Sequence, residues 1–198
     1  MITAGPLESF FKSPCLQPSH EGDSILFHLR LDLVKLFGSE GEQARSDSSH
    51  WMLGLMGVLS GIDYLSQVYS AEKDSRPRFV ETLRQLQGLS EKDSQAIYQL
   101  RCALVHSVAL STVSKCSFRK GTRFIFNITD DNAHPLISLM SDDGKNATYL
   151  ISFWKLRRVF LEVIDALELI ARDSTHKKNS QIIKMIGQMH SEKILKKE

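Results

Sequence analysis

The spacing of the hydrophobic residues changes twice along this chain of 198 residues. From residue 21 to about residue 110 they recur at three- and four-residue steps, which is typical of helices that bury one face. Between residues 115 and 150 they alternate or form short β-branched and aromatic runs, which predicts strands. From Ser152 the helical spacing returns. We therefore expect a mainly α fold, a bundle of five or six helices with a small antiparallel β insertion at about residues 115–150.

Capping residues mark the expected ends of the helices. Gly38 is placed to end the first helix, and Ser75, followed by Arg-Pro, is placed to begin the third. Ser90, with Asp93 three residues later, is placed to begin the fourth helix, which we expect over residues 91–110. The second helix carries three small residues that would let a neighbouring segment approach closely: Gly54, Gly57 and Gly61.

Turn residues divide the insertion into strands. Its apolar runs are CSFRK, TRFIFNIT, PLISLM and ATYLI. They are separated by Lys-Gly, by Asp-Asp-Asn and by Asp-Asp-Gly-Lys. Because short polar connections of this kind join neighbouring antiparallel strands, we expect a meander placed between the helices.

The chain divides into one main domain and two flanking segments. Residues 21–175 are expected to form the helical domain, including the insertion. Residues 1–20 contain Pro and Ser without periodicity, which predicts a flexible N-terminal arm. Residues 176–198 are expected to form a basic amphipathic helix, because the chain from Arg172 onward holds seven basic and three acidic residues. The net charge of +2 for the whole chain does not by itself predict a polyanionic partner.

Several features point to a cytoplasmic protein. The three cysteines, Cys15, Cys102 and Cys116, form no CxxC pair, which argues against a disulfide framework or a zinc ribbon. The N-terminus lacks the basic and apolar regions of a secretory signal. The longest apolar run, residues 51–62, is too short to cross a membrane. We expect no membrane association, no metal and no cofactor.

The segment IYQLRCALVHSVAL, within residues 97–110, carries the most information about function. Placed on a helix, it is apolar on nearly every side, so it is expected to lie at the centre of a bundle or between two subunits. It nevertheless contains Arg101 and His106, which are costly to bury without partners. Either these two side chains are paired structurally or they face a polar cleft.

Within this segment, YQLRCALVHS resembles the R-x4-6-H signature of the HEPN superfamily, whose helical domains act on RNA and nucleotides. The resemblance covers the second to fifth helices, and it implies a homodimer in which both motif helices line one cleft. It further implies a metal-independent endoribonuclease of the bacterial toxin or defence type, with RNA as substrate and a cognate antitoxin as partner. Arg101 would hold the scissile phosphate, and His106 would move the proton of the attacking 2′-hydroxyl or of the leaving oxygen.

Neighbouring positions complete the expected site. Asp63 and Tyr64 in the second helix could support Arg101 or His106 through a carboxylate or a hydroxyl. Cys102 stands where active members of the family often carry Asn, Asp or His, and Val108 stands where one toxin branch has Tyr. These departures bear on catalysis more than on the fold. Three cations of the helix after the insertion could contact nucleic acid or be its solvated side: Lys155, Arg157 and Arg158.

The same residues allow other interpretations. In a non-catalytic HEPN-fold module for dimerisation or interaction, Arg101 would form a structural ion pair with a carboxylate such as Asp63, and His106 would be a core histidine. Cys102 and His106, four residues apart, could form half of a metal site, but no second pair has matching spacing. An adaptor that binds partners through the basic C-terminal helix and the β insertion is a third interpretation.

Overall fold

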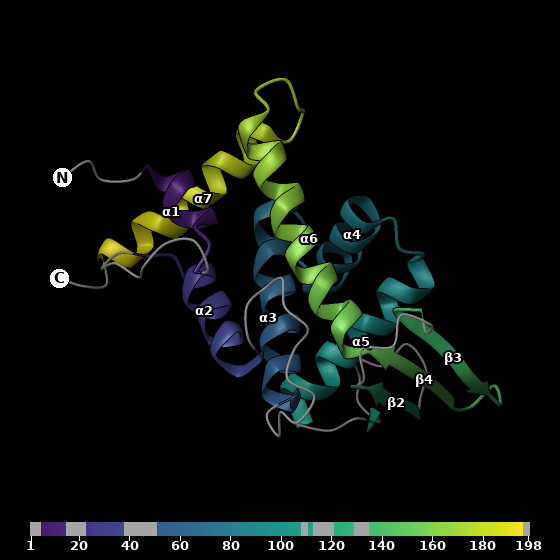
Figure 1. The fold of residues 1–198 in the computed structure, drawn as a ribbon. Coiled ribbons are helices and arrows are strands. Elements are labelled where there is room, and N and C mark those ends of the chain that lie inside the picture. The colour runs from purple at the N-terminus through teal and green to yellow at the C-terminus, as the bar shows by residue number, and fades with distance from the viewer. Residues whose placement is uncertain are drawn as a thin grey trace.

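The computed structural model describes residues 5–14, 23–37, 51–107, 111–112, 121–128 and 135–195, and these form seven helices and four strands (Figure 1). The helices are α1 (Pro6–Phe11), α2 (Ile25–Phe37), α3 (Trp51–Tyr69), α4 (Ser75–Gln87), α5 (Glu91–Ser107), α6 (Phe153–Arg172) and α7 (Asn179–Leu195). The strands are β1 (Ser111–Thr112), β2 (Thr122–Asn127), β3 (Ile137–Asp142) and β4 (Ala147–Ser152). The prediction of a mainly α fold with a small β insertion is confirmed, although there are more helices than expected. The expected strand CSFRK lies outside the described residues.

Helix α3 is the centre of the bundle, and it packs against α2, α4, α5, α6 and α7. Most of its apolar side chains are buried, which requires neighbours on several sides. Two of its glycines explain how closely these neighbours approach. A Cβ atom at Gly54 would lie 1.9 Å from the Phe37 ring, and one at Gly61 would lie 2.4 Å from the Phe160 ring. Any larger residue would therefore push α2 or α6 away from α3.

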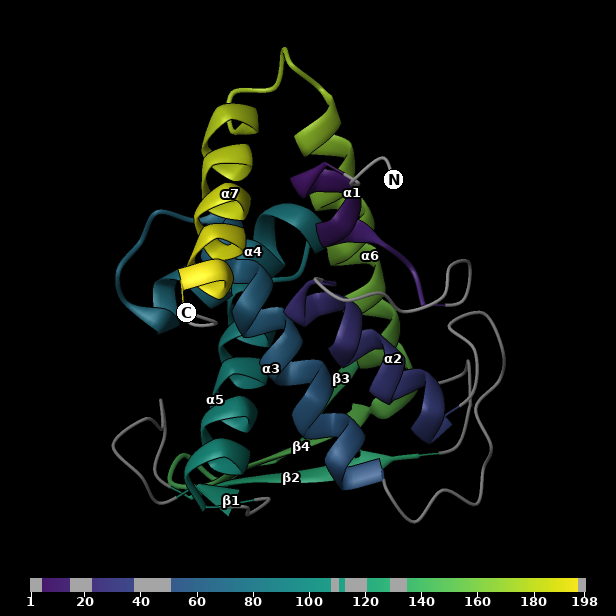
Figure 2. The ribbon, with the colours of Figure 1, turned by 90° about the vertical axis from the view of Figure 1, so that its left-hand side faces the viewer.

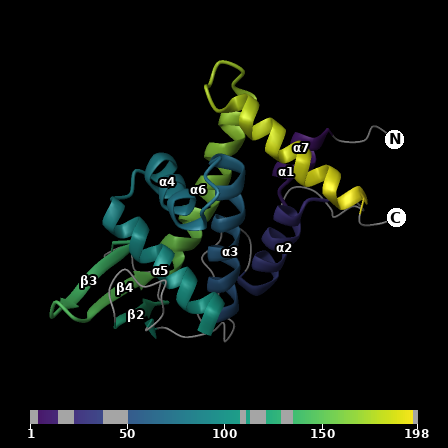
Figure 3. The ribbon, with the colours of Figure 1, turned by 180° about the vertical axis from the view of Figure 1, so that it is seen from behind.

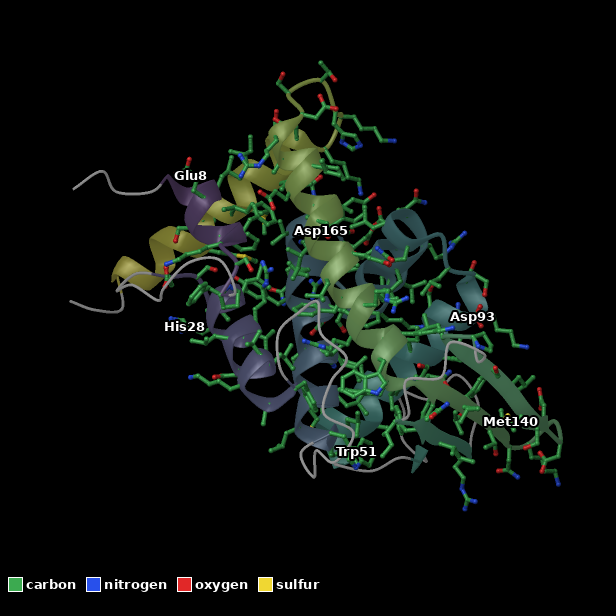
Figure 4. All side chains as sticks on the ribbon, in the orientation of Figure 1. Glu8, His28, Trp51, Asp93, Met140 and Asp165 are labelled. Atoms are coloured by element: carbon green, nitrogen blue, oxygen red, sulfur yellow. The ribbon has the colours of Figure 1, made fainter. Side chains whose placement is uncertain are left out.

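The sheet lies across one end of the bundle, below α3, α5 and α6 as drawn in Figure 2. Its strand order is β1-β2-β4-β3, and β2 and β4 run parallel, with Phe124 opposite Tyr149. The expected antiparallel meander is therefore wrong, because the sheet is mixed. Strand β4 is more buried than β2 and β3 and lies between them, and the more exposed β3 takes one edge. A turn with Gly144 at φ 80° joins β3 to β4, and Met140 lies exposed at a bulge in β3 (Figure 4).

The N-terminal segment is packed where it is described, which corrects the expected flexible arm over residues 5–14. Helix α1 buries Phe10 and Phe11 against the core. The ammonium of Lys12 lies 2.9 Å from the carboxylate of Asp23, and both side chains are buried. Two large aromatic side chains and a buried ion pair anchor this segment.

Helix α7 also belongs to the main core. It follows α6 and runs beside α1 (Figure 3). Ile182 and Ile186 are buried in the core, while Lys184 is exposed. The basic C-terminal helix is thus a part of the bundle rather than a separate segment. Among the helices of the described ranges, none has both the length and the hydropathy required to cross a lipid bilayer.

Candidate functional site

Arg101 of α5 forms an ion pair with Asp63 of α3. Its Nη2 atom lies 2.7 Å from Asp63 Oδ2, and the side chains of Arg101 and Asp63 are 17% and 13% exposed. Burial disfavours the charged guanidinium, but the charge and the hydrogen bond of Asp63 outweigh this effect and raise the pKa of Arg101. The expected contact between Asp63 and Arg101 is therefore present, and it is partly open to solvent.

A second guanidinium, that of Arg78 in the first turns of α4, faces the same carboxylate. Its Nη2 atom lies 3.9 Å from Asp63 Oδ1, and its side chain is 14% exposed. Its Nε atom donates to Ser66 Oγ at 3.3 Å, and Nη1 donates to the carbonyls of Glu72 at 3.4 Å and Lys73 at 3.5 Å. We call Asp63, Arg78 and Arg101 the arginine cluster. It holds two positive charges and one negative charge.

The hydrogen bonding of the arginine cluster is incomplete. Arg101 and Asp63 share a single short bond, although a guanidinium and a carboxylate can form two parallel bonds. Among the described residues, Arg101 Nε and Asp63 Oδ1 are buried and have no hydrogen-bond partner. Buried polar atoms of this kind are uncommon because leaving them unpaired costs free energy. The cluster thus retains one unused donor and one unused acceptor.

Sequence reasoning missed Arg78. Its partner Asp63 lies in the preceding helix, and the two side chains meet only because α3 and α4 pack together. The available signal was the spacing of Asp63 and Ser66, which are three residues apart and share one face of α3. A polar pair on a largely apolar helix predicts a polar or charged partner on the neighbouring element.

The other two supporting residues have different surroundings. The ring of Tyr64 stacks on that of Phe10 in α1, with centroids 6.1 Å apart. Burial raises the pKa of Tyr64 to about 12, so its hydroxyl stays protonated near neutral pH. Tyr64 thus packs toward α1, and no contact with Arg101 is seen among the described side chains. Cys102 is buried in the core beside Arg101.

His106 lies five residues after Arg101 on α5, so the two Cα atoms differ by about 7.5 Å in height along the helix. The backbone of His106 is helical, but its side chain lies outside the described part of the structure. Val108 also lies outside it. The structure therefore brings Asp63 to Arg101, and the role of His106 stays a prediction.

The three cations of α6 do not form one exposed patch. Arg158 is exposed, and Lys155 is half-buried. Arg157, expected to contact nucleic acid, is instead 5% exposed, and its guanidinium lies 5.9 Å from the centroid of the Trp154 ring. The reason is helical geometry, because positions 155 and 158 share one side of the helix, whereas position 157 points toward the buried side.

A second group of polar residues lies nearby, where α3, α4 and α7 meet. Lys178 Nζ lies 2.8 Å from Glu81 Oε1, and Ser70 Oγ donates to Glu81 Oε2 at 2.6 Å. Burial tends to raise the pKa of Glu81, but hydrogen bonds from Lys178 and Ser70 and the Lys178 charge lower it below its ordinary value. We call Ser70, Glu81 and Lys178 the lysine cluster. It lines an open pocket of about 430 Å³ together with residues 71–74 and Gln181.

No protein-family model, curated protein or solved structure matches the chain. The HEPN resemblance therefore stays a prediction. Within the described ranges, no three His, Cys, Asp or Glu side chains are grouped as metal ligands would be.

Proposed function

We propose that the chain is a HEPN-like protein directed at RNA or nucleotides, and that it is a metal-independent endoribonuclease of the bacterial toxin or defence type. The observation that supports this proposal is the arginine cluster. Arg101 of the R-x4-H segment lies in a partly exposed group that carries one excess positive charge. A phosphodiester is an anion whose oxygens accept hydrogen bonds from a guanidinium, so it fits this environment.

The proposed reaction needs only side-chain groups and the RNA. The 2′-oxygen attacks the adjacent phosphorus, the bond from phosphorus to the 5′-oxygen breaks, and the products carry a 2′,3′-cyclic phosphate and a 5′-hydroxyl. Arg101 would stabilise the charge that develops on the phosphate. His106 would accept the proton of the 2′-hydroxyl or donate a proton to the leaving oxygen, a role suited to a group that titrates near neutral pH.

A homodimer is part of the proposal. Residues five positions apart point about 140° apart around a helix axis, so one straight helix presents Arg101 and His106 to a small ligand poorly. Two copies of α5 that meet across a twofold axis would place the arginine of one copy near the histidine of the other. A cognate antitoxin and a cytoplasmic location complete the proposal.

The second candidate is a non-catalytic HEPN-fold module for dimerisation or interaction. The observation that favours it is the short bond between Arg101 and Asp63, at 2.7 Å, which is the geometry of a structural ion pair. In this alternative the arginine cluster holds α3, α4 and α5 together and has no substrate.

Cleavage assays distinguish the two candidates. Purified wild type, Arg101→Gln and His106→Ala are incubated with structured RNA in EDTA, and Arg172→Gln serves as the control because Arg172 is an exposed cation paired within α6. We expect 2′,3′-cyclic ends with wild type and with the control, and rates lower by at least about 100-fold in the other two variants. Loss of thermal stability in Arg101→Gln and His106→Ala without any change in RNA cleavage would favour the non-catalytic module.

A further inference from the structure

The unequal charges of the arginine cluster suggest a role for Arg78. We infer that Arg78 is a second anion-binding residue, and that Arg78 and Arg101 together hold one singly charged phosphodiester group. This inference rests on the proposed function for a phosphate at Arg101, and it adds a residue from a different helix.

The first argument is the charge balance. Asp63 is the one carboxylate that the described structure places within ion-pair distance of both Arg78 and Arg101. The three side chains are 13–17% exposed, so solvent screens the excess positive charge only in part. A ligand with one negative charge would neutralise the cluster. A terminal phosphate carries nearly two negative charges and would leave an excess of negative charge beside Asp63, so an internal phosphodiester fits better.

The second argument is that Arg78 is positioned without being strongly bonded. Its contacts with Ser66, Glu72 and Lys73 are 3.3–3.5 Å long, at or beyond the usual limit for N–H···O hydrogen bonds. These three acceptors are uncharged. A phosphate oxygen would offer a charge-assisted bond of about 2.7–2.9 Å, which is stronger than any of them. Arg78 would therefore lose little when it turns toward a phosphate.

The third argument is that Arg101 has an unused donor. Its Nη2 atom is bonded to Asp63, whereas its Nε atom has no partner among the described residues. A ligand oxygen that reached Nε would satisfy this donor while Asp63 holds Nη2. One phosphate group between the two arginines would then receive donors from both α4 and α5.

Binding of a 2′-O-methyl RNA oligonucleotide tests the inference, because its phosphodiesters are intact and its blocked 2′-oxygen prevents cleavage. Fluorescence anisotropy measures the Kd of a labelled single strand between 50 and 200 mM salt, a range in which phosphate contacts have a strong effect. Arg78→Gln is compared with wild type. Arg84→Gln is the matched control, because it removes one exposed cation from the same helix, where Arg84 pairs with Glu91 at 3.4 Å.

We expect Arg78→Gln to raise the Kd by about tenfold and to reduce the slope of log K against log salt by about 0.7, as for the loss of one contact to a single strand. The control is expected to stay within about twofold of wild type. Arg78→Lys keeps the charge but not the planar fork, so we expect it to recover the slope but only part of the affinity.

The possible outcomes separate this inference from the proposed function. If Arg101→Gln weakens binding and Arg78→Gln behaves like Arg84→Gln, the inference is overturned and the proposed function stands. If wild type binds the modified strand through Arg78 but does not cleave unmodified RNA, the inference stands and the proposed ribonuclease activity is overturned. No binding by wild type overturns the inference. If circular dichroism shows that Arg78→Gln is unfolded, Arg78→Lys decides, and a wild-type affinity in that variant overturns the inference.

Discussion

The two charged clusters of this protein contact α4 in different ways. Asp63 of α3 faces Arg78, and Ser70, which directly follows α3, contacts Glu81. In the lysine cluster, Glu81 neutralises Lys178 through a 2.8 Å contact, and the ammonium also lies 3.6 Å from the centroid of the Tyr69 ring. The arginine cluster has one short contact, two unpaired buried atoms and an excess charge.

This difference separates a structural contact from a candidate binding site. The charges of the lysine cluster are balanced, and Ser70 satisfies the second oxygen of Glu81. A ligand in the neighbouring pocket would therefore have to compete with contacts that are already made. In the arginine cluster a ligand would supply what is missing, namely a negative charge and an acceptor. Four substitutions or measurements test this comparison.

The largest effect is expected for Asp63→Asn. This change removes the negative charge that compensates both Arg78 and Arg101, and the two partly buried guanidinium groups would then repel each other. We expect the free energy of unfolding, measured by urea denaturation, to fall by about 3 kcal/mol, the lower end for breaking a buried ion pair. Asp32→Asn is the control, because Asp32 forms an exposed pair with Lys35 at 3.8 Å, and it should change stability by less than about 0.5 kcal/mol. Equal losses of stability in Asp63→Asn and Asp32→Asn would contradict the role assigned to Asp63 in the arginine cluster.

A smaller effect is expected for Glu81→Gln in the lysine cluster. Lys178 would keep its contacts with the ring and the carbonyl oxygen of Tyr69, and water reaches the partly exposed Glu81. We expect a loss of about 1 kcal/mol in the free energy of unfolding at neutral pH. Glu168→Gln, which breaks an exposed pair within α6, is the matched control and should cost less than about 0.5 kcal/mol. A loss as large as that of Asp63→Asn would remove the contrast between the clusters.

The pH dependence of the lysine cluster gives a third test. Because folding lowers the pKa of Glu81 from its ordinary value of 4.5, the folded state favours the charged carboxylate. The resulting stability is present above the ordinary pKa and is lost as the pH falls through the lower pKa of the folded state. Wild type and Glu81→Gln should therefore converge in stability as the pH falls from 7 toward 3, by less than about 1 kcal/mol because the group is partly exposed. A gap that widens on acidification would contradict the assigned shift.

The sequence predicted the helices well because their signals are local. Ser90 accepts a hydrogen bond from the backbone of Asp93 at the expected start of α5, and Gly88 ends α4 in the left-handed conformation. The burial of α1 was missed because a helix of six residues is too short to show a period. The parallel pairing of β2 with β4 was missed because strand order depends on which strand is best buried, and turn residues do not report this.

Only part of the candidate site could be predicted from the sequence, namely the contact of Arg101 with Asp63. A buried arginine requires a carboxylate, so the contact of Arg101 with Asp63 could be anticipated from an apolar helix that contains a charge. Arg78 lies near the start of its helix, where a cation is normally solvated, and its burial follows from the angle at which α4 packs on α3. Such an angle is a tertiary property, and the hydrophobic period does not predict it.

The smallest effect is expected for Arg78→Gln, and it separates the two arginines that share Asp63. Arg101 makes the 2.7 Å bond, so we expect Arg101→Gln to lower the free energy of unfolding by about 2 kcal/mol. Arg78 makes only long contacts among the described residues, and its removal also relieves the excess positive charge, so its loss should change stability by less than about 0.5 kcal/mol. Urea denaturation of both variants measures the difference. Equal losses in the free energy of unfolding would mean that Arg78, like Lys178, mainly holds neighbouring elements together. A residue that serves to bind a ligand makes its strongest contacts only when that ligand is bound.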